Sequence, residues 1–277
     1  MTPKLTSIIL NYRNSSDTLG CLKSLQSADL GKNMNYLIVD NSADGGESAI
    51  EIREAAPEID LIINKENLGF AGGNNIGIKK AIAKGAHYVL IINPDVRVGK
   101  NFFKPLLSHF SDTRIGIVAP AIKHSQKNKV VYGLEGKVDW TLAKPEHRNL
   151  SQIKENNPVK SQFVTFACVI IATKAFKKAG LLDDGYFMYF EDVDYCLTAH
   201  KSGYDIILDP TVLVTHRTSS SFKSPTGKLP ISFKSHLRFI FKWLKWPDLI
   251  RPLIYAVTLY PYLYLLWSYH SLKYRAR

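Results

Sequence analysis

Residues 88–95 read YVLIINPD, an uninterrupted apolar run that ends on an asparagine, a proline and an acid. A run without polar alternation is typical of a strand buried on both faces, as in a parallel sheet covered by helices on each side. Residues 37–41, LIVDN, repeat the pattern and end on Asp40 and Asn41. The chain therefore carries at least two buried strands, and each is followed closely by an acid.

Apolar strands alternate with helical patterns along the first 120 residues. Strands are expected at 6–10, 35–40, 59–64, 87–92 and 115–120, and helices at 16–27, 46–55, 72–84 and 100–110. Such alternation predicts parallel strands joined by crossover helices. The predicted fold class is α/β, with a Rossmann-like, mostly parallel sheet flanked by helices.

The pattern changes after residue 121. The polar segments 123–129 and 144–160 are expected to be exposed loops on either side of a hairpin at 130–140. An apolar strand at 163–173, a short helix at 174–179 and a helix at 193–202 follow.

The composition is that of a folded globular protein, with 45% hydrophobic and 22% charged residues. The net charge of +12 is concentrated, because residues 217–277 hold eleven Lys or Arg against one acid. The first 216 residues are nearly neutral, which argues against a nucleic-acid-binding main domain. The basic tail instead indicates contact with an anionic surface.

The cysteines and the N-terminus point to a reducing compartment. Cys21, Cys168 and Cys196 are odd in number, lack paired spacing and lie in apolar surroundings, so we expect buried free thiols. The apolar run at 7–10 is too short for a signal peptide. The sequence thus predicts a cytoplasmic protein.

Polar residues follow three successive predicted strands, at Asp40, at 67–75 and at 93–95. Ligands of open parallel sheets bind outside the carboxyl ends of the strands, so these segments are expected to share one cleft. A single acid after a strand more often belongs to a turn or caps a helix. Polar segments after three successive strands favour a site instead. The glycines of 67–75, NLGFAGGNN, could aim backbone N–H groups at a phosphate or serve tight strand–helix packing. Their spacing matches neither a dinucleotide fingerprint nor a P-loop.

Residues 186–194, YFMYFEDVD, place Glu191, Asp192 and Asp194 directly after a run of aromatic side chains. Acids at a helix start are favoured by the helix dipole, so capping is one interpretation. Apolar neighbours also raise the pKa of a carboxylate, as a general base requires, and this is the other interpretation.

Asp95 leaves a carboxylate at a strand end. A hard cation such as Mg²⁺ or Mn²⁺ takes oxygen ligands and can share them with substrate phosphates. His216 follows the strand-like segment 211–214 and is the best second ligand, although a lone histidine is more often structural. The expected cofactor is therefore Mg²⁺ or Mn²⁺.

Taken together, these segments resemble the inverting family 2 glycosyltransferases of the GT-A fold, and most of all the rhamnosyltransferase-type members that build bacterial surface polysaccharides. The matching segments are SIILNYRN, LIVDNSADGG, NLGFAGGNNIGI, YVLIINPDV and YFMYFEDVDYCLTAHKSGY, followed by His216, all within residues 5–221. We place a GT-A catalytic domain in residues 1–225 and a basic, helical, membrane-associating tail in residues 226–277.

The resemblance implies a donor site for a nucleotide sugar. Asp40 would hydrogen-bond the nucleotide base, with Asn11 nearby. The turn from Gly69 to Asn74 would lie against the nucleotide sugar or the diphosphate. Asn93 replaces the first acid of the family's DXD motif; it can still accept from the ribose, but the site has one negative charge fewer.

The resemblance also implies the reacting groups. Asp95 corresponds to the last acid of the DXD motif and would bind the metal together with His216. Asp192 would be the general base that deprotonates the acceptor. Glu191 would orient the acceptor and Asp194 would cap the helix, although either could be a surface acid.

Other departures bear on the sugar and the acceptor more than on the reaction class. Thr198 and His200 stand where relatives usually carry arginines, and Phe166 stands where a glycine is common.

The tail predicts a basic amphipathic helix. Its basic stripe is Lys234, Arg238, Lys242 and Lys245, beside an apolar face that contains Phe233, Leu237, Ile240, Phe241 and Leu244. Such a helix is typical of a membrane interface, which we favour over docking on the catalytic domain. The uncharged residues 252–269 contain two prolines and five tyrosines, which favours a hairpin lying in the interface over a membrane crossing.

The leading hypothesis is a metal-dependent inverting sugar transferase on the inner face of the cell membrane. Its donor would be a nucleotide sugar, with dTDP-rhamnose as a candidate, and its acceptor a glycan or a polyprenyl-diphosphate-linked sugar. Two alternatives are a sugar-phosphate nucleotidyltransferase and a non-catalytic membrane-surface binding module. The first would place a glycine-rich loop after strand one, where this chain has NYRNSS.

Overall fold

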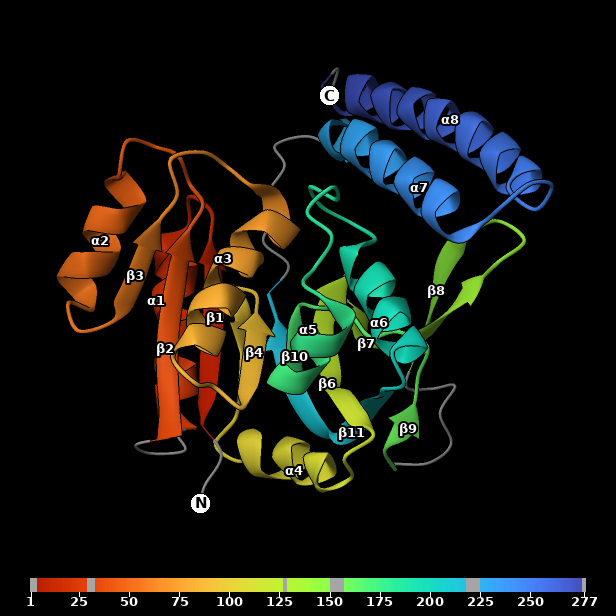
Figure 1. Cartoon of the computed structure of the whole chain (residues 1–277). Helices are drawn as coiled ribbons and strands as arrows, with labels where there is room; N and C mark the ends of the chain where they lie inside the picture. Colours follow the sequence, from red (N-terminus) through yellow and green to blue (C-terminus); the bar gives the residue numbers. More distant parts are fainter. Residues whose placement is uncertain (1–3, 29–32, 127–128, 150–156, 218–224, 276–277) are drawn as a thin grey trace.

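The computed structural model describes residues 4–28, 33–126, 129–149, 157–217 and 225–275. A single sheet runs through the molecule with strands in the order β3-β2-β1-β4-β10-β6-β11-β5, extended by β7, β8 and β9 (Figure 1). The strands are β1 (Leu5–Asn11), β2 (Met34–Asp40), β3 (Asp60–Ile63), β4 (Tyr88–Ile92), β5 (Val96–Arg97), β6 (Ile115–Gln126), β7 (Lys129–Asp139), β8 (Lys144–Asn149), β9 (Val159–Lys160), β10 (Cys168–Ala172) and β11 (Asp205–His216). The helices are α1 (Ser15–Ser27), α2 (Glu47–Ala55), α3 (Gly69–Ala83), α4 (Phe103–Ser108), α5 (Thr173–Ala179), α6 (Glu191–Lys201), α7 (Leu229–Trp243) and α8 (Ile250–Arg275), with 3₁₀ turns η2 (His109–Ser111) and η4 (Pro225–Lys228).

The sheet is mostly parallel, as predicted. β1 pairs in parallel with β2 and β4, β2 with β3, and β6 with β11. β10 is antiparallel and lies between β4 and β6, so it joins the two parallel halves. The helices cover both faces, which gives the three layers of an α/β domain.

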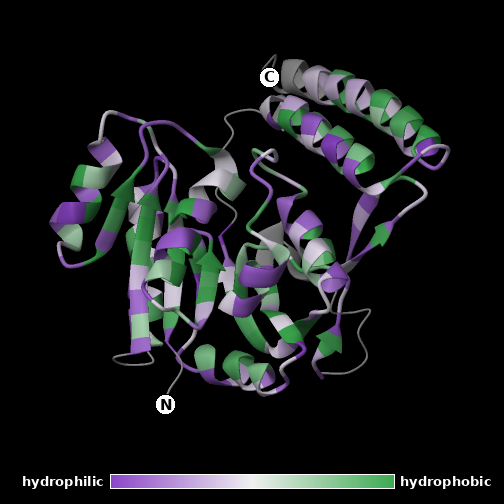
Figure 2. Ribbon diagram, viewed as in Figure 1, coloured by the Kyte–Doolittle hydropathy of each residue, from purple (hydrophilic) through white to green (hydrophobic). Residues whose placement is uncertain are grey.

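The central strands are apolar on both faces. In β4, Val89 and Ile91 belong to the core under α3, α5 and α6, whereas Leu90 and Ile92 belong to the core under α1 and α4. Figure 2 shows the same strands as predominantly hydrophobic. This two-sided burial is the reason that the sequence lacks polar alternation here.

Two predicted loops are largely strands. β6 continues through the polar residues 123–126, and β7 and β8 follow it as an antiparallel extension of the sheet. The hairpin predicted around 130–140 is longer than expected, because 129–139 is one strand, β7, and the second arm is β8, antiparallel to it after a turn at 140–143. Polar composition misled the prediction, since a sheet extension with an exposed face tolerates polar residues. Residues 127–128 and 150–156 of the predicted loops lie outside the described residues.

The tail forms an antiparallel pair of helices, α7 and α8, that lies across one end of the molecule (Figure 1). Residues 252–269 are one stretch of α8 with Pro261 inside it, so the hairpin predicted within this segment is wrong. Pro252 falls in the first helical turn, where a missing N–H costs little. No helix in the described part of the chain is both long and apolar enough to cross a membrane.

The three cysteines are buried and free, as predicted. Burial raises the pKa of Cys21 to about 12, so this thiol is not reactive.

Candidate active site

Asp95 and His216 meet at a corner of the sheet. β5 turns back after Asp95 and pairs antiparallel with the end of β11, where His216 lies opposite Val96. The Nε2 atom of His216 lies 3.0 Å from Oδ1 of Asp95, and the backbone N–H of Arg217 donates to the Asp95 carbonyl at 2.9 Å. The structure thus brings together the two residues expected to bind the metal.

A cation bound at this corner would have Asp95 and His216 as its protein ligands. In the described residues no cluster of three or more His, Cys, Asp or Glu is suited to a metal. A carboxylate oxygen and an imidazole nitrogen nevertheless suit Mn²⁺, and Mg²⁺-type sites commonly take one or two protein ligands plus phosphates and water. The donor set fits a cation that arrives with a diphosphate.

Asp40 is held by a buried network between β1 and β2. Asn11 lies opposite it in the sheet, and the Asn11 amide donates to Asp40 Oδ1 at 2.8 Å. Thr18 donates to Asn11 Oδ1 at 2.7 Å, and the Ser42 hydroxyl donates to Asp40 Oδ1 at 2.5 Å. Asn11 and Ser42 thereby fix the carboxylate. Sequence reasoning missed Ser42 and Thr18, since a lone hydroxyl carries no local signal.

The glycine-rich turn packs closely against the aromatic segment that precedes α6. Gly69 has a φ of +69°, and a Cβ atom there would lie 2.2 Å from the carbonyl oxygen of Phe187. The backbone N–H of Phe70 donates to that same oxygen at 2.7 Å. Gly73 and Gly77 pack on Leu10 and Ile8. Close packing therefore accounts for these glycines, and α3 begins at Gly69 rather than Gly72.

Asn41 and Asn74 are the buried amides around this turn. Asn41 accepts from the Leu68 N–H at 3.1 Å and donates to the Gly69 carbonyl at 3.0 Å, so it holds the turn in place. Asn74 donates to the Phe70 carbonyl at 2.9 Å, while its buried Oδ1 has no partner in the described chain. Asn41 was missed, although it directly follows Asp40 in the LIVDN segment.

Two consecutive left-handed residues introduce the acids of α6. Tyr189 and Phe190 both have φ of +70°, a conformation that costs roughly 1–2 kcal/mol for a residue with a side chain. The helix then begins at Glu191 without a side-chain cap. Strain of this kind persists where packing enforces it and is concentrated at functional sites. Phe190 stacks on the His236 ring of α7 at 5.0 Å between centroids.

Glu191 and Asp192 are both more basic than ordinary carboxyl groups. Burial raises the pKa of Glu191 well above its usual range, and the Asp192 charge beside it adds to the effect. Burial also raises the pKa of Asp192, while the backbone N–H groups of Val193 and Phe166 and the nearby His147 partly oppose this. The buried Oε2 of Glu191 has no hydrogen-bond partner in the described chain.

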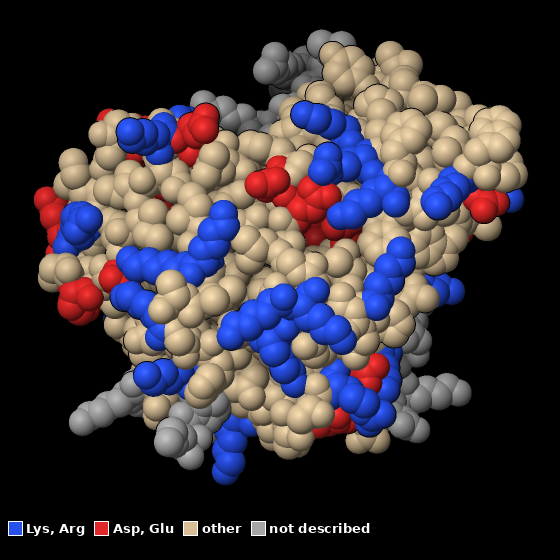
Figure 3. All heavy atoms as spheres, viewed as in Figure 1, with Lys and Arg blue, Asp and Glu red and all other residues tan. Residues whose placement is uncertain are grey.

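Asp194 does not cap the helix, contrary to the prediction. Its carboxylate accepts from Trp243 Nε1 and Lys242 Nζ, each at 2.7 Å, and from the Tyr186 hydroxyl at 3.3 Å. Arg238 and Lys242 also pair with Asp183, at 2.6 and 2.8 Å. Figure 3 shows acids beside a row of bases where the helix pair meets the rest of the molecule. α7 is thus tied to the segment that carries the acids.

A short segment lies between the two acidic regions. The Asn93 N–H donates to the Ala167 carbonyl at 2.9 Å, which joins the end of β4 to this segment. The adjacent Phe166 N–H faces the Asp192 carboxylate and lowers its pKa. The end of β4 and the start of α6 therefore approach neighbouring residues, and Asn11 and Asp40 end the strands β1 and β2 of the same parallel group.

The departures from the family pattern have local roles. Phe166 is buried and meets the Tyr195 ring edge-on at 5.9 Å between centroids. Thr198 donates back to the Asp194 carbonyl at 2.8 Å, and His200 is exposed.

Residues 6–180 match the family described as glycosyl transferase family 2. The chain belongs to this family. It is 27% identical over 214 residues to the low-salt glycan biosynthesis hexosyltransferase Agl10 of Haloferax volcanii, covering 74% of this chain and 64% of that protein. It is 24% identical over 264 residues to the N-acetylglucosaminyl-diphospho-decaprenol L-rhamnosyltransferase of Mycobacterium tuberculosis, covering 87% and 85% of the two chains.

Solved structures share the fold. The crystal structure of GalNAc-T7 with UDP, GalNAc and Mn²⁺ superposes with a TM-score of 0.68 at 16% identity, covering 89% of this chain and 49% of that one. The mannosyltransferase PcManGT from Pyrobaculum calidifontis, in complex with GDP-Man and Mn²⁺, gives 0.60 at 13% identity, covering 100% and 76%. The GT-A-like fold expected from the sequence is confirmed, and family membership favours a glycosyltransferase over a nucleotidyltransferase or a binding module.

Proposed function

We propose that this glycosyltransferase moves a sugar from a nucleoside diphosphate to an acceptor hydroxyl with inversion, using Asp192 as general base. The observation that carries the proposal is the contact between Asp95 and His216 at the end of β4, next to the segment that Asp192 faces. A diphosphate leaving group and a base on the acceptor side are the two requirements of a single displacement.

The donor would bind along the ends of β1, β2 and β4. Asp40, fixed by Asn11, would accept from the nucleotide base, and Asn93 would contact the ribose. The α3 turn between Gly69 and Asn74 would lie against the donor sugar or diphosphate. Asp95 and His216 would hold Mg²⁺ or Mn²⁺, which when bound supplies positive charge to the departing diphosphate.

The acceptor would bind beside the start of α6. Asp192 would take the proton of the acceptor hydroxyl as its oxygen attacks C1 of the sugar, while the bond from C1 to the diphosphate oxygen breaks. A raised pKa makes Asp192 a stronger base than an ordinary aspartate. Burial and the Asp192 charge raise the pKa of Glu191, so this group would keep its proton to a higher pH than an ordinary glutamate and, when protonated, would donate to the acceptor.

The named relatives suggest the substrates. Two of them are rhamnosyltransferases, the M. tuberculosis protein and the dTDP-rhamnosyl transferase RfbF of Shigella flexneri, which is 22% identical over 220 residues. We therefore propose dTDP-rhamnose as the donor to test first and a polyprenyl-diphosphate-linked sugar as the acceptor.

The α7–α8 pair would rest on the inner face of the cell membrane. Ile254 and Leu265 on the outer side of α8 are 58% and 68% exposed. Such apolar exposure on one face marks an interaction surface. Lys234 and Lys245 remain exposed, whereas Arg238 and Lys242 of the predicted basic stripe pair with protein carboxylates.

A pair of substitutions tests the membrane contact. Ile254→Glu should reduce co-sedimentation with phosphatidylglycerol vesicles several-fold. Ile50→Glu is the matched control, because Ile50 on α2 is also 58% exposed. Equal sedimentation of the two variants would contradict membrane contact through α8. Deletion of the tail is a poorer test, because Phe239 and Ile240 of α7 belong to the core.

The transfer itself is tested with purified protein, Mn²⁺ and a panel of nucleotide sugars. We expect release of the nucleoside diphosphate to increase when a sugar acceptor is added, with the product anomer inverted by proton NMR. Release of pyrophosphate from a nucleoside triphosphate and a sugar phosphate, without transfer, would contradict the proposal.

A further inference from the structure

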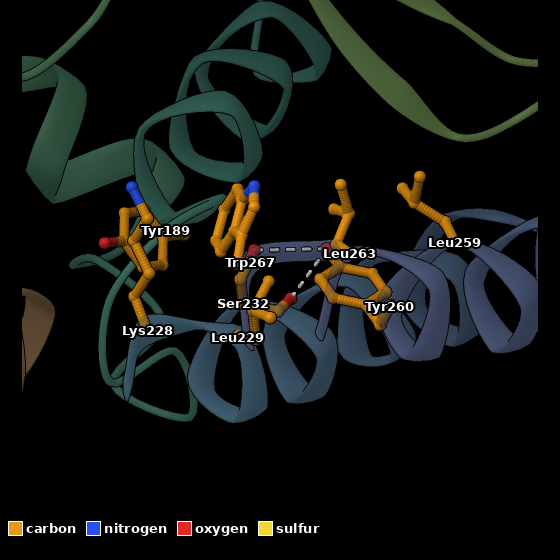
Figure 4. A pocket seen from close by; sticks show the side chains of 8 residues that line it. All are labelled: Tyr189, Lys228, Leu229, Ser232, Leu259, Tyr260, Leu263 and Trp267. Carbon is orange, nitrogen blue, oxygen red and sulfur yellow. Dashed lines mark hydrogen bonds between the residues drawn. The ribbon is translucent and has the colours of Figure 1, made fainter. Parts of the chain in front are cut away.

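A cavity of about 220 Å³ lies between α7, α8 and the aromatic segment before α6. It is separate from the donor residues and is formed in part by the tail. Figure 4 shows Lys228 and Tyr189 at one end of the cavity, Trp267 next to them, and Leu263 and Leu259 toward the other end. The cavity therefore has a polar end and an aliphatic end.

The polar end suits an anion. Lys228 is the one charged residue among the described residues of the lining, and none of them is acidic. Its ammonium lies 5.4 Å from the centroid of the Trp267 ring, which holds it at the cavity. The hydroxyls of Ser232 and Tyr260 lie 3.1 Å apart and bond each other. Lys228 is thus the group of this wall best suited to a phosphate.

The same end adjoins the proposed acceptor side. Tyr189 belongs both to the cavity wall and to the left-handed pair of residues directly before Glu191. Ser235 of α7 donates to the Met188 carbonyl at 2.8 Å, which fixes this segment against the tail. An anionic group at Lys228 would therefore sit close to the start of α6.

The aliphatic end leads toward an apolar surface. No Lys, Arg, Asp or Glu occurs between Arg251 and Lys273. Ile254 and Val257 on the outer side of α8 are 58% and 51% exposed. Sites for drug-sized ligands measure about 300–1,000 Å³, so this cavity is suited to a short section of one chain, with the remainder along α8.

We propose that this cavity binds the phosphate and the first part of the hydrocarbon chain of a single-chain lipid phosphate, the carrier end of the acceptor. The inference rests on the proposed function for the identity of the acceptor. Lys228 binds the phosphate, the Leu259–Leu263 side binds the chain, and Tyr189 marks the end from which the attached sugar extends toward Asp192.

Binding of farnesyl phosphate to the full-length chain tests this proposal without any need for transfer. Calorimetry should show saturable binding below the concentration at which the probe forms micelles. Farnesol, which lacks the phosphate, should bind at least tenfold more weakly, and inorganic phosphate should not bind. Didecanoyl phosphatidic acid, which has two chains, should also bind at least tenfold more weakly.

Two leucines of α8 provide a matched pair of variants. Leu263→Trp fills the cavity and should weaken farnesyl phosphate at least tenfold, whereas Leu265→Trp on the exposed side should change it less than twofold. Lys228→Gln requires no repacking, and should reduce farnesyl phosphate to the level of farnesol. Circular dichroism and melting temperature check that each variant folds.

Several results would overturn the proposal. One is unchanged binding in both Leu263→Trp and Lys228→Gln. Another is a greater loss in Leu265→Trp than in Leu263→Trp, which would indicate adsorption on the outer face. Equal affinity for phosphatidic acid would assign the site to membrane phospholipid instead. If farnesyl phosphate binds as expected but no sugar is transferred from any donor, the proposed function is contradicted and the lipid phosphate site is not.

Discussion

Asp95, which follows β4, and Asp192, in the first turn of α6, have different surroundings. Asn93 at the end of β4 bonds to Ala167, and Asp192 faces the neighbouring Phe166. Asp95 faces a basic nitrogen, His216 Nε2, at 3.0 Å. Asp192 lies beside a second carboxyl group, Glu191, among apolar side chains that raise the pKa of both. The first arrangement suits a ligand for positive charge, and the second suits a group that takes up a proton.

The difference shows how environment assigns roles to identical side chains. A carboxylate that must hold a cation should stay ionised, whereas a carboxylate that must accept a proton benefits from a raised pKa. The fold separates the two acids by placing Asp95 beside the end of β11 and Asp192 directly after the left-handed pair Tyr189 and Phe190. Exchanging or removing these surroundings tests whether the roles are assigned correctly.

The largest effect is expected for Asp192→Asn. Loss of a general base lowers the rate by about 10²–10⁴-fold, and kcat should fall by this amount. Asp184→Asn is the control, since Asp184 is an exposed acid on the preceding segment. A kcat within threefold of the wild type would remove Asp192 from the role of base.

The pH dependence of kcat/KM of the wild type also tests Asp192 as the general base. The base must be ionised to act, and burial raises the pKa of Asp192. The acidic limb of kcat/KM should therefore lie above about pH 4, the usual range of an aspartate. It should disappear in Asp192→Asn, measured on the residual activity. A limb that persists unchanged belongs to another group.

The next largest effect is expected for the proposed metal ligand Asp95. Asp95→Asn should raise the Mn²⁺ concentration needed for half-maximal activity at least about tenfold, because it removes the proposed anionic ligand, and loss of even an outer-shell partner costs about 10–100-fold. Asn93→Asp should change it in the opposite direction, since added ligand charge tightens binding of hard cations. Metal titrations of the initial rate measure both. An unchanged or lower half-maximal Mn²⁺ concentration in Asp95→Asn would show that Asp95 is not a metal ligand.

A moderate effect is expected on stability rather than on chemistry. Trp243→Phe removes the 2.7 Å hydrogen bond to the buried Asp194 carboxylate. A hydrogen bond to a charged group contributes about 1.5–3 kcal/mol, so the free energy of unfolding should fall by about that amount. Trp246→Phe is the matched control, because Trp246 is 76% exposed. Equal urea midpoints for the two variants would show that α7 does not stabilise the acidic segment.

The smallest effect is a change in how the free energy of unfolding depends on pH. The pKa of Glu191 is raised in the folded state, so its contribution to stability is complete below the usual pKa of a glutamate. This contribution is lost as the pH rises through the raised pKa. Glu191→Gln cannot ionise, so its stability relative to wild type should increase from pH 5 to pH 8 in urea unfolding. Glu54→Gln, at an exposed acid on α2, should show no such trend.

Local patterns were enough to predict the parallel strands at the centre of the sheet. The uninterrupted run of β4 and the acid after β2 identify buried parallel strands, because those signals lie within a few residues. The strand β8 was missed, since a strand at the edge of a sheet and a polar loop can have the same composition.

The environment of each acid could not be predicted from the sequence. The Asp194 carboxylate accepts hydrogen bonds from Trp243 and Lys242, about fifty positions further along the chain. No local pattern in the sequence indicates that pairing. The acids of α6 resemble a capping pattern equally well. His216 was a candidate ligand from its place after a strand-like segment, but its pairing with Asp95 depended on resemblance to a family, because the contact forms through the short pairing of β5 with β11.

The most direct test of the two roles is calorimetric binding of dTDP and UDP with Mn²⁺ to wild type, Asp95→Asn and Asp192→Asn. If Asp95 binds the metal and Asp192 acts only on the acceptor, Asp192→Asn should bind the nucleoside diphosphates with Mn²⁺ as tightly as wild type. Asp95→Asn should bind them at least about tenfold more weakly, because it lacks a metal ligand. Undiminished Mn²⁺-dependent binding in Asp95→Asn, with loss in Asp192→Asn, would contradict the assignment.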